Sequence, residues 1–218
     1  VEGCKMLLKH KASADIQNLS GATALLYACD RGNYESIKML LDHNADVNLA
    51  NDKGFTPLIR CAVATYHSDY TVCLELLLKH NADANAKTIE GSTGLILAAT
   101  RGVAGCVRVL LKQANIDINA SDKDGCTALI RASMWGHVKI INDLIKAGAA
   151  VDVQDRNGRT ALHLASAGGY YGSVHSLLQH GADWSKVDEN GVTAKELATS
   201  MRRVTLLPLF KEYEKNKQ

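Results

Sequence analysis

Arginine and aromatic residues recur at matching places along this chain, and their chemistry is that of a contact surface. Two recurring positions carry them: Arg31, Arg101 and Trp135 share one, and Tyr27, Arg60 and Arg131 share the other. A guanidinium group presents a planar fork of donors to a carboxylate, and Trp, Tyr and Arg are frequent hot spots of protein interfaces. Any single arginine could equally be a solvated side chain. Together they predict a discontinuous cationic and aromatic strip suited to an acidic peptide or loop with an apolar anchor.

Motifs for catalysis or metal binding are absent from the sequence. No G-x-x-x-x-G-K-[ST], H-E-x-x-H or G-x-S-x-G run occurs. His10, His43, His80 and His180 recur at the ends of predicted helices, where a histidine complements the helix dipole. Their spacing is too wide for one coordination shell with bonds of about 2 Å. We therefore expect no enzymatic activity, no metal site and no cofactor.

The six cysteines follow no disulfide or metal-binding pattern. Cys73 and Cys106 hold the same place in successive repeats, and packed helices stand about 8–10 Å apart, beyond the Cα separation of roughly 7 Å that a disulfide spans. Free thiols predict a reducing compartment, the cytoplasm or the nucleus. The net charge is +2, and no apolar run approaches the roughly 18 residues that span a bilayer, so membrane insertion is not expected.

The elements that position these residues belong to a repeat. A threonine lies two residues after a glycine six times, and these glycines are separated by 33, 37, 34, 33 and 33 residues: Gly21, Gly54, Gly91, Gly125, Gly158 and Gly191. A period near 33 residues indicates one supersecondary unit stacked many times. Each threonine is predicted to cap a helix, and Pro57 suits a first helical turn.

Two apolar stripes follow each threonine and predict two antiparallel helices. In the first repeat they are Leu25, Ala28 and Cys29, and then Ile37, Leu40 and Leu41. Spacings of three and four residues place each stripe on one helix face. Asn or Gly after the second helix suits its left-handed C′ position, and turn-forming residues then lead to the next glycine.

In these residues the chain resembles the ankyrin-repeat family, whose unit runs from D-x-x-G-x-T-P-L-H-x-A to L-L-x-x-G-A-D-V-N. The resemblance covers the whole chain and implies an all-α solenoid of helix-turn-helix units joined by β-hairpin-like loops. It divides the chain into a partial repeat at 1–17, repeats at 18–50, 51–87, 88–121, 122–154 and 155–187, and a divergent C-terminal capping repeat at 188–218. The repeat at 51–87 carries a four-residue insertion. Because residues 1–9 read as the middle of a second helix, we expect the chain to be a fragment.

The chain departs from the family pattern at three places. The histidine of T-P-L-H survives only as His163, and apolar residues are expected to pack where it is replaced: Leu26, Ile59, Ile96 and Ile130. Lys195 replaces the usual leucine in the last repeat. The terminal helix from Leu206 to Tyr213 leads into a charged tail, as a C-terminal cap requires.

The resemblance implies a protein-interaction module or scaffold that binds through a concave groove lined by hairpin tips and first helices. The insertion places Tyr66, His67 and Tyr70 at the groove's edge, either as contacts or as tolerated surface residues. Two alternatives stay open: a regulatory or targeting domain of a larger enzyme or effector, and, opposed by interleaved acidic residues, nucleic-acid binding. We expect a monomeric array with these partner contacts: Tyr27, Arg31, Phe55, Arg60, Tyr66, His67, Tyr70, Arg101, Arg131, Met134, Trp135, Arg156 and Arg159.

Overall fold

The computed structural model describes residues 2–10, 12–63 and 70–215. Throughout this part of the chain short α-helices alternate with loops, and isolated antiparallel bridges such as Lys87–Thr93 stand where strands would pair. The predicted all-α stack of helix pairs is confirmed. The chain forms two compact units, which are residues Val1–Asp117 (unit 1) and Ile118–Gln218 (unit 2).

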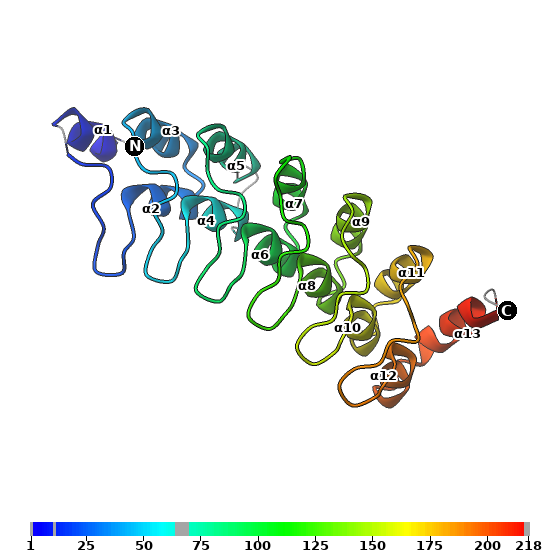
Figure 1. The fold of residues 1–218 in the computed structure, drawn as a ribbon. Helices are drawn as coiled ribbons and strands as arrows, with labels where there is room; N and C mark the ends of the chain where they lie inside the picture. Colours follow the sequence, from blue (N-terminus) through cyan, green and yellow to red (C-terminus); the bar gives the residue numbers. More distant parts are fainter. Residues whose placement is uncertain (1, 11, 64–69, 216–218) are drawn as a thin grey trace. The chain divides into compact units, whose positions relative to one another are not determined.

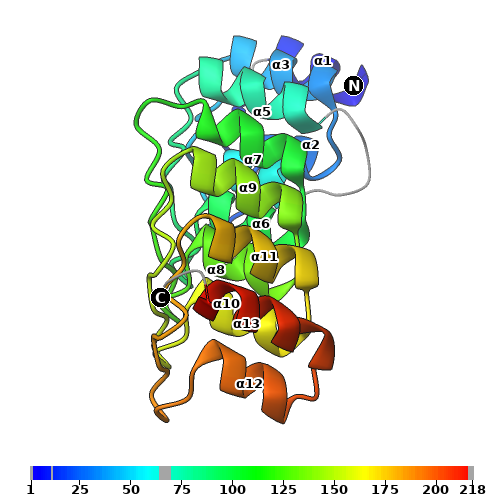
Figure 2. The ribbon, with the colours of Figure 1, turned by 90° about the vertical axis from the view of Figure 1, so that its right-hand side faces the viewer.

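Unit 1 contains two rows of helices (Figures 1 and 2). The row beside the hairpin loops, here called the inner helices, consists of α2 (Ala24–Asp30), α4 (Pro57–Val63) and α6 (Gly94–Arg101). The other row, the outer helices, consists of α1 (Glu2–Lys9), α3 (Tyr34–Asp42), α5 (Tyr70–Lys79) and α7 (Ala104–Leu111).

Unit 2 has the same arrangement. Its inner helices are α8 (Ala128–Met134), α10 (Ala161–Gly168) and α12 (Ala194–Ser200). Its outer helices are α9 (Val138–Lys146), α11 (Tyr171–Gln179) and α13 (Leu207–Lys215), with a 3₁₀ turn at Val204–Leu206 before α13.

The predicted helix caps are present in the inner helices. Thr23 accepts a hydrogen bond from the N–H of Leu26, and Thr56 accepts one from Ile59. Thr93, Thr127, Thr160 and Thr193 make the same bond three residues on. The glycine two residues earlier has a positive φ in every repeat, as at Gly54 (φ 74°), which an L side chain adopts only with strain.

Each hairpin loop is held by the side chain of its first residue. Asn51 Oδ1 accepts hydrogen bonds from the backbone N–H groups of Lys53 and Phe55, both at 3.0 Å. Asn18, Asp122, Asp155 and Asp188 bond in the same way at the start of their hairpins. These Asx turns set the path of the chain into the next inner helix.

Backbone hydrogen bonds also join neighbouring hairpins within each unit. In unit 1 the Asp52 N–H donates to Ser20 O (3.2 Å) and the Ile89 N–H donates to Lys53 O (3.1 Å). In unit 2 the Arg156 N–H donates to Asp124 O (2.9 Å) and the Glu189 N–H donates to Asn157 O (3.0 Å). The hairpins of a unit therefore keep a fixed register.

The predicted apolar stripes form the core of each unit, and cysteine side chains belong to it. Among the described residues, five cysteines are buried there: Cys29, Cys61, Cys73, Cys106 and Cys126. Desolvation raises the pKa of Cys106 to about 12 and that of Cys126 to about 11, so these thiols stay protonated near neutral pH. The apolar residues that replace the family's histidine are buried as expected, for example Ile59 and Ile96.

His163 keeps the hydrogen bonds that its family position implies. Its Nδ1 accepts from the N–H of Thr160 (3.2 Å), and its Nε2 lies 3.1 Å from Val192 O. The neutral ring with its proton on Nε2 satisfies both contacts. Burial lowers the pKa of His163 below its ordinary value of 6.5, because desolvation penalises the charged form.

This lowered pKa predicts that unit 2 loses stability in acid. In the unfolded chain, His163 binds a proton as the pH falls through about 6.5, whereas in the folded protein it binds that proton only at a lower pH. The free energy of unfolding therefore decreases as the pH falls from 6.5 to the folded pKa of His163. Urea midpoints from pH 7.5 to 5.5 measure the loss. His163→Ile, which installs the residue of three other repeats, should remove most of this slope. An equal slope in both proteins would contradict the assignment.

Charged and apolar contacts join the terminal helix α13 to the rest of unit 2. Lys195, in place of a leucine, makes a 2.6 Å ion pair with Glu214 of α13. Leu206, Leu209 and Phe210 are buried, with exposed fractions of 0–2 %. Apolar side chains thus cover the end of the stack, while α13 presents charged residues to solvent.

Candidate functional site

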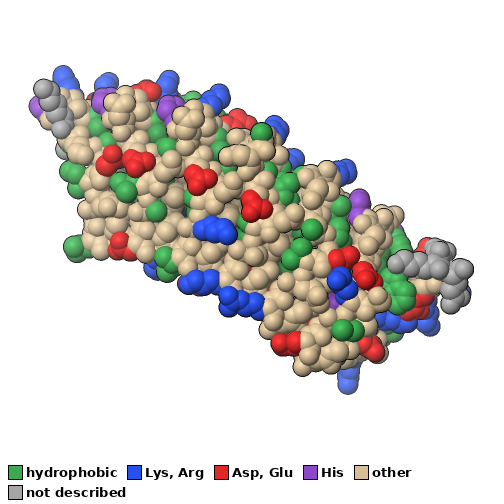
Figure 3. Space-filling view, viewed as in Figure 1, with side chains coloured by type: hydrophobic (Ala, Val, Ile, Leu, Met, Phe, Trp, Pro, Cys, Tyr) green, Lys and Arg blue, Asp and Glu red, His purple; other side chains and the backbone are tan. Residues whose placement is uncertain are grey.

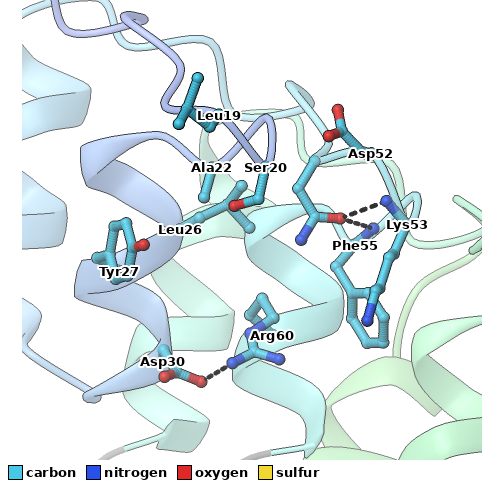
Figure 4. A pocket seen from close by; sticks show the side chains of 11 residues that line it. Leu19, Ser20, Ala22, Leu26, Tyr27, Asp30, Asp52, Lys53, Phe55 and Arg60 are labelled. Atoms are coloured by element: carbon cyan, nitrogen blue, oxygen red, sulfur yellow. Dashed lines mark hydrogen bonds and ion pairs between the residues drawn. The ribbon is translucent and has the colours of Figure 1, made fainter.

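An open cavity of about 560 Å³ lies in unit 1 between its first two hairpins and helices α2 and α4 (Figure 4). Clefts of this size are typical of sites that take side chains or small ligands. Its lining comes from the first hairpin and α2 (Leu19, Ser20, Ala22, Leu26, Tyr27 and Asp30) and from the second hairpin and α4 (Asn51, Asp52, Lys53, Phe55 and Arg60).

Arg60 is held in place at the floor of the cavity. One guanidinium nitrogen pairs with Asp30 of α2, and the group lies 5.5 Å from the centroid of the Phe55 ring. The backbone carbonyl of Asp30 accepts a hydrogen bond from the Tyr70 hydroxyl (3.1 Å). The Arg60 side chain is still 33 % exposed, so such a pair adds at most about 1 kcal/mol to stability. Its effect is to orient the guanidinium group.

Two neighbouring residues of the second hairpin differ in where their polar groups lie. Asn51 uses its amide oxygen within the hairpin, which leaves its NH₂ group without a partner among the described residues. The Asp52 carboxylate packs against Gly21 of the first hairpin, where an added Cβ would lie 2.6 Å from its Oδ1. In Figure 4 this carboxylate is directed away from Arg60.

Apolar side chains form the opposite wall. Leu19 is fully exposed at the tip of the first hairpin, Tyr27 is 53 % exposed and Leu26 is buried. The Tyr27 hydroxyl accepts a hydrogen bond from Asn18 Nδ2 at 3.0 Å. Beyond the cavity, Arg31 and Arg101 are exposed at the ends of α2 and α6, and neither makes an ion pair among the described residues.

The arginines of unit 2 include two that are not free cations. Arg131 pairs with both Asp122 and Asp124, each at 2.7 Å, and Arg159 pairs with Asp155 at 2.8 Å. Asp122 and Asp155 are the first residues of their hairpins. In each, one carboxylate oxygen accepts hydrogen bonds from the hairpin backbone and the other accepts from the arginine. The expectation that Arg131 adds positive charge to the cationic and aromatic strip needs correction, because these carboxylates neutralise it, and Arg159, a predicted contact outside the strip, is neutralised in the same way.

The other predicted contacts of unit 2 remain accessible. Trp135 is 55 % exposed at the C-cap of α8, and Met134 beside it is partly exposed. The Arg156 side chain is exposed at a hairpin tip. Unit 2 therefore presents an aromatic side chain and one free cation among its predicted contacts.

The prediction that Tyr70 contacts a partner at the groove's edge is wrong. Tyr70 is 3 % exposed, and its ring packs at Gly32, where an added Cβ would lie 2.9 Å from it. Tyr170 holds the equivalent position in its own repeat and packs at Gly136. Tyr70 is therefore a packing residue between repeats. Tyr66 and His67, predicted with it, lie outside the described residues.

The charges on the surface are mixed in sign. On the face drawn in Figure 3, each unit carries both Lys or Arg and Asp or Glu side chains.

The histidines at the ends of the outer helices bond to their own helix. The ring Nδ1 atoms of His43, His80 and His180 each lie 2.8–3.0 Å from the backbone carbonyl four residues earlier. Within residues 2–10, 12–63 and 70–215, no three His, Cys, Asp or Glu side chains are grouped so that they could hold a metal ion.

Several cavity residues were not among the predicted contacts. Asp30, Asn51 and Lys53 line it, and the pairing of Asp30 with Arg60 depends on a contact between repeats. The hairpin position shared by Asn51, Asp122 and Asp155 was a usable signal, since a turn-forming residue three positions before each glycine predicts a side chain bonded to the loop.

Comparison with known proteins adds one finding. A family model described as ankyrin repeats matches residues 1–88, 62–155 and 139–218, three copies that together cover the chain. The search of curated proteins returned no match. Among the helices of the described residues, none is long and apolar enough to cross a membrane.

Proposed function

The chain belongs to the ankyrin-repeat family, whose repeats are generally protein-interaction modules and typically non-catalytic, and we propose that it binds a partner protein through the inner helices and hairpin tips. The partner segment is a peptide or loop that carries negative charge and an apolar anchor.

The observation that carries this proposal is the exposure of aromatic side chains on the inner helices. Tyr27 and Trp135 are 53 % and 55 % exposed, whereas Arg60 and Arg131, which share the position of Tyr27 in their own repeats, are paired with carboxylates. Aromatic residues supply a large contact area and are enriched in interface hot spots. The free cations Arg31, Arg101 and Arg156 support a preference for acidic partners.

Affinity capture from a cell lysate with identification by mass spectrometry tests this proposal. The variant carries Tyr27→Ser, Arg101→Glu and Trp135→Ser, all at exposed positions of the inner helices. We expect specific proteins bound by the wild type to be lost, because such hot spots contribute about 2 kcal/mol or more each.

A matched control variant makes the same kinds of change on the outer helices, with Val72→Ser, Lys112→Glu and Tyr171→Ser, also at exposed positions. It should retain the partners, and both variants should keep the wild-type circular dichroism. Equal recovery by all three proteins would contradict the proposed face. Nucleic acid in the eluate, with binding that weakens steeply in salt, would favour the alternative class of partner.

A further inference from the structure

We propose that the cavity of unit 1 binds an Asp or Glu side chain of the partner, together with an apolar side chain close to it in the same extended segment. This inference rests on the proposed function and assigns one pocket and one ligand chemistry to it.

Donor groups without partners converge on the cavity. One guanidinium nitrogen of Arg60 binds Asp30, and its remaining N–H groups are available to a ligand. The NH₂ group of Asn51 is also available, since only its amide oxygen is used within the hairpin. Lys53, which also lines the cavity, makes no ion pair among the described residues. A carboxylate can accept from several donors at once, and its bonds to charged donors are stronger than neutral ones.

The acidic residues of the cavity do not cancel this preference. The Asp30 carboxylate is engaged by Arg60, and that of Asp52 lies over Gly21 and is directed away from the floor. A cationic ligand would meet the Lys53 ammonium group with no unpaired carboxylate on the floor to hold it. The available hydrogen-bonding groups of the floor therefore favour an acceptor with negative charge.

The apolar wall sets the second half of the ligand. Leu19 and Tyr27 expose apolar surface beside the donors, and Leu26 and Ala22 complete that side. Because the first and second hairpins lie next to each other in register, one extended segment can reach both walls. Its apolar side chain packs on Leu19 and Tyr27 while its carboxylate meets Arg60 and Lys53. A cavity of about 560 Å³ holds two side chains of this kind.

Selection from a displayed library of random dodecapeptides on the full chain tests the inference. We expect enriched peptides to share Asp or Glu within three positions of Leu, Ile, Phe or Tyr. For an enriched peptide, fluorescence anisotropy gives the Kd. Replacing its acidic residue with the matching amide should weaken binding by about 10-fold or more, since charge-assisted hydrogen bonds are lost.

Lys53→Glu in the protein should raise the Kd of the acidic peptide by a similar factor. It should also abolish the difference in Kd between the acidic peptide and its amide form. Lys112→Glu, which makes the same charge change on an outer helix of unit 1, should leave the Kd unchanged. The inference is overturned if no peptide is enriched, if enriched peptides lack the acidic residue, or if Lys53→Glu has no effect. Loss of lysate partners from the Tyr27 variant alongside any of these results would leave the proposed function standing.

Discussion

Gly158→Ala is expected to lower the free energy of unfolding of unit 2 by about 2–4 kcal/mol, as left-handed strain adds to a steric clash. Gly158 has φ 71°, and a Cβ there would lie 2.8 Å from the backbone nitrogen of Glu189 and 3.1 Å from the carbonyl carbon of Asp188. The clash falls on backbone atoms of the next hairpin, which cannot rotate away. Urea denaturation, with amide hydrogen exchange to locate the change, measures the loss.

Gly191→Ala is the matched control. Gly191 holds the same hairpin position with φ 75°, but no described atom lies within 4 Å of an added Cβ. This variant should lose only about 1 kcal/mol from the left-handed backbone. Equal losses at the two positions would mean that close approach of neighbouring hairpins does not contribute to stability.

Phe210→Ala is expected to cost about 3–5 kcal/mol, which is typical of a buried Phe replaced by Ala. Phe210 is 1 % exposed and is among the largest fully buried side chains of the described chain. Its loss should release α13 and uncover α12, so amide exchange should accelerate first in these two helices. A calorimetric scan gives the fall in melting temperature.

Val204→Ala tests whether the effect of Phe210→Ala comes from burial. Val204 lies in the same terminal segment but is 68 % exposed, so its truncation should change stability by no more than about 0.5 kcal/mol. If Val204→Ala and Phe210→Ala were equally harmful, the terminal segment would be sensitive to any change and the cap would not depend on its apolar side.

The repeated elements could be predicted because their signals are local. A glycine with positive φ, a threonine cap and a left-handed residue after the second helix act within a few residues of themselves. Gly54, Thr56 and Asn81 therefore show in the structure the conformations that the sequence predicts. Repetition of these signals strengthened each assignment.

The site could be predicted only in part, because side-chain pairing depends on contacts between elements. The spacing of arginines did not reveal that a carboxylate of its own hairpin neutralises Arg131. The hairpin before Arg60 begins with the neutral Asn51 in place of an Asp, and Arg60 pairs with Asp30 of α2 instead. Likewise, Tyr70 follows an insertion and looked exposed, but its ring fits the space that Gly32 leaves free. Such complementarity between repeats is not visible from one repeat's sequence.

The links between neighbouring hairpins have a consequence for variation at their tips. Bonds such as those of the Asp52 N–H with Ser20 O, and of the Glu189 N–H with Asn157 O, join backbone atoms alone. Side chains at the hairpin tips can therefore be replaced without loss of these hydrogen bonds, provided that the hairpin glycines are kept. A combinatorial library randomised at Leu19, Lys53 and Arg156 should yield many folded members that differ in what they bind.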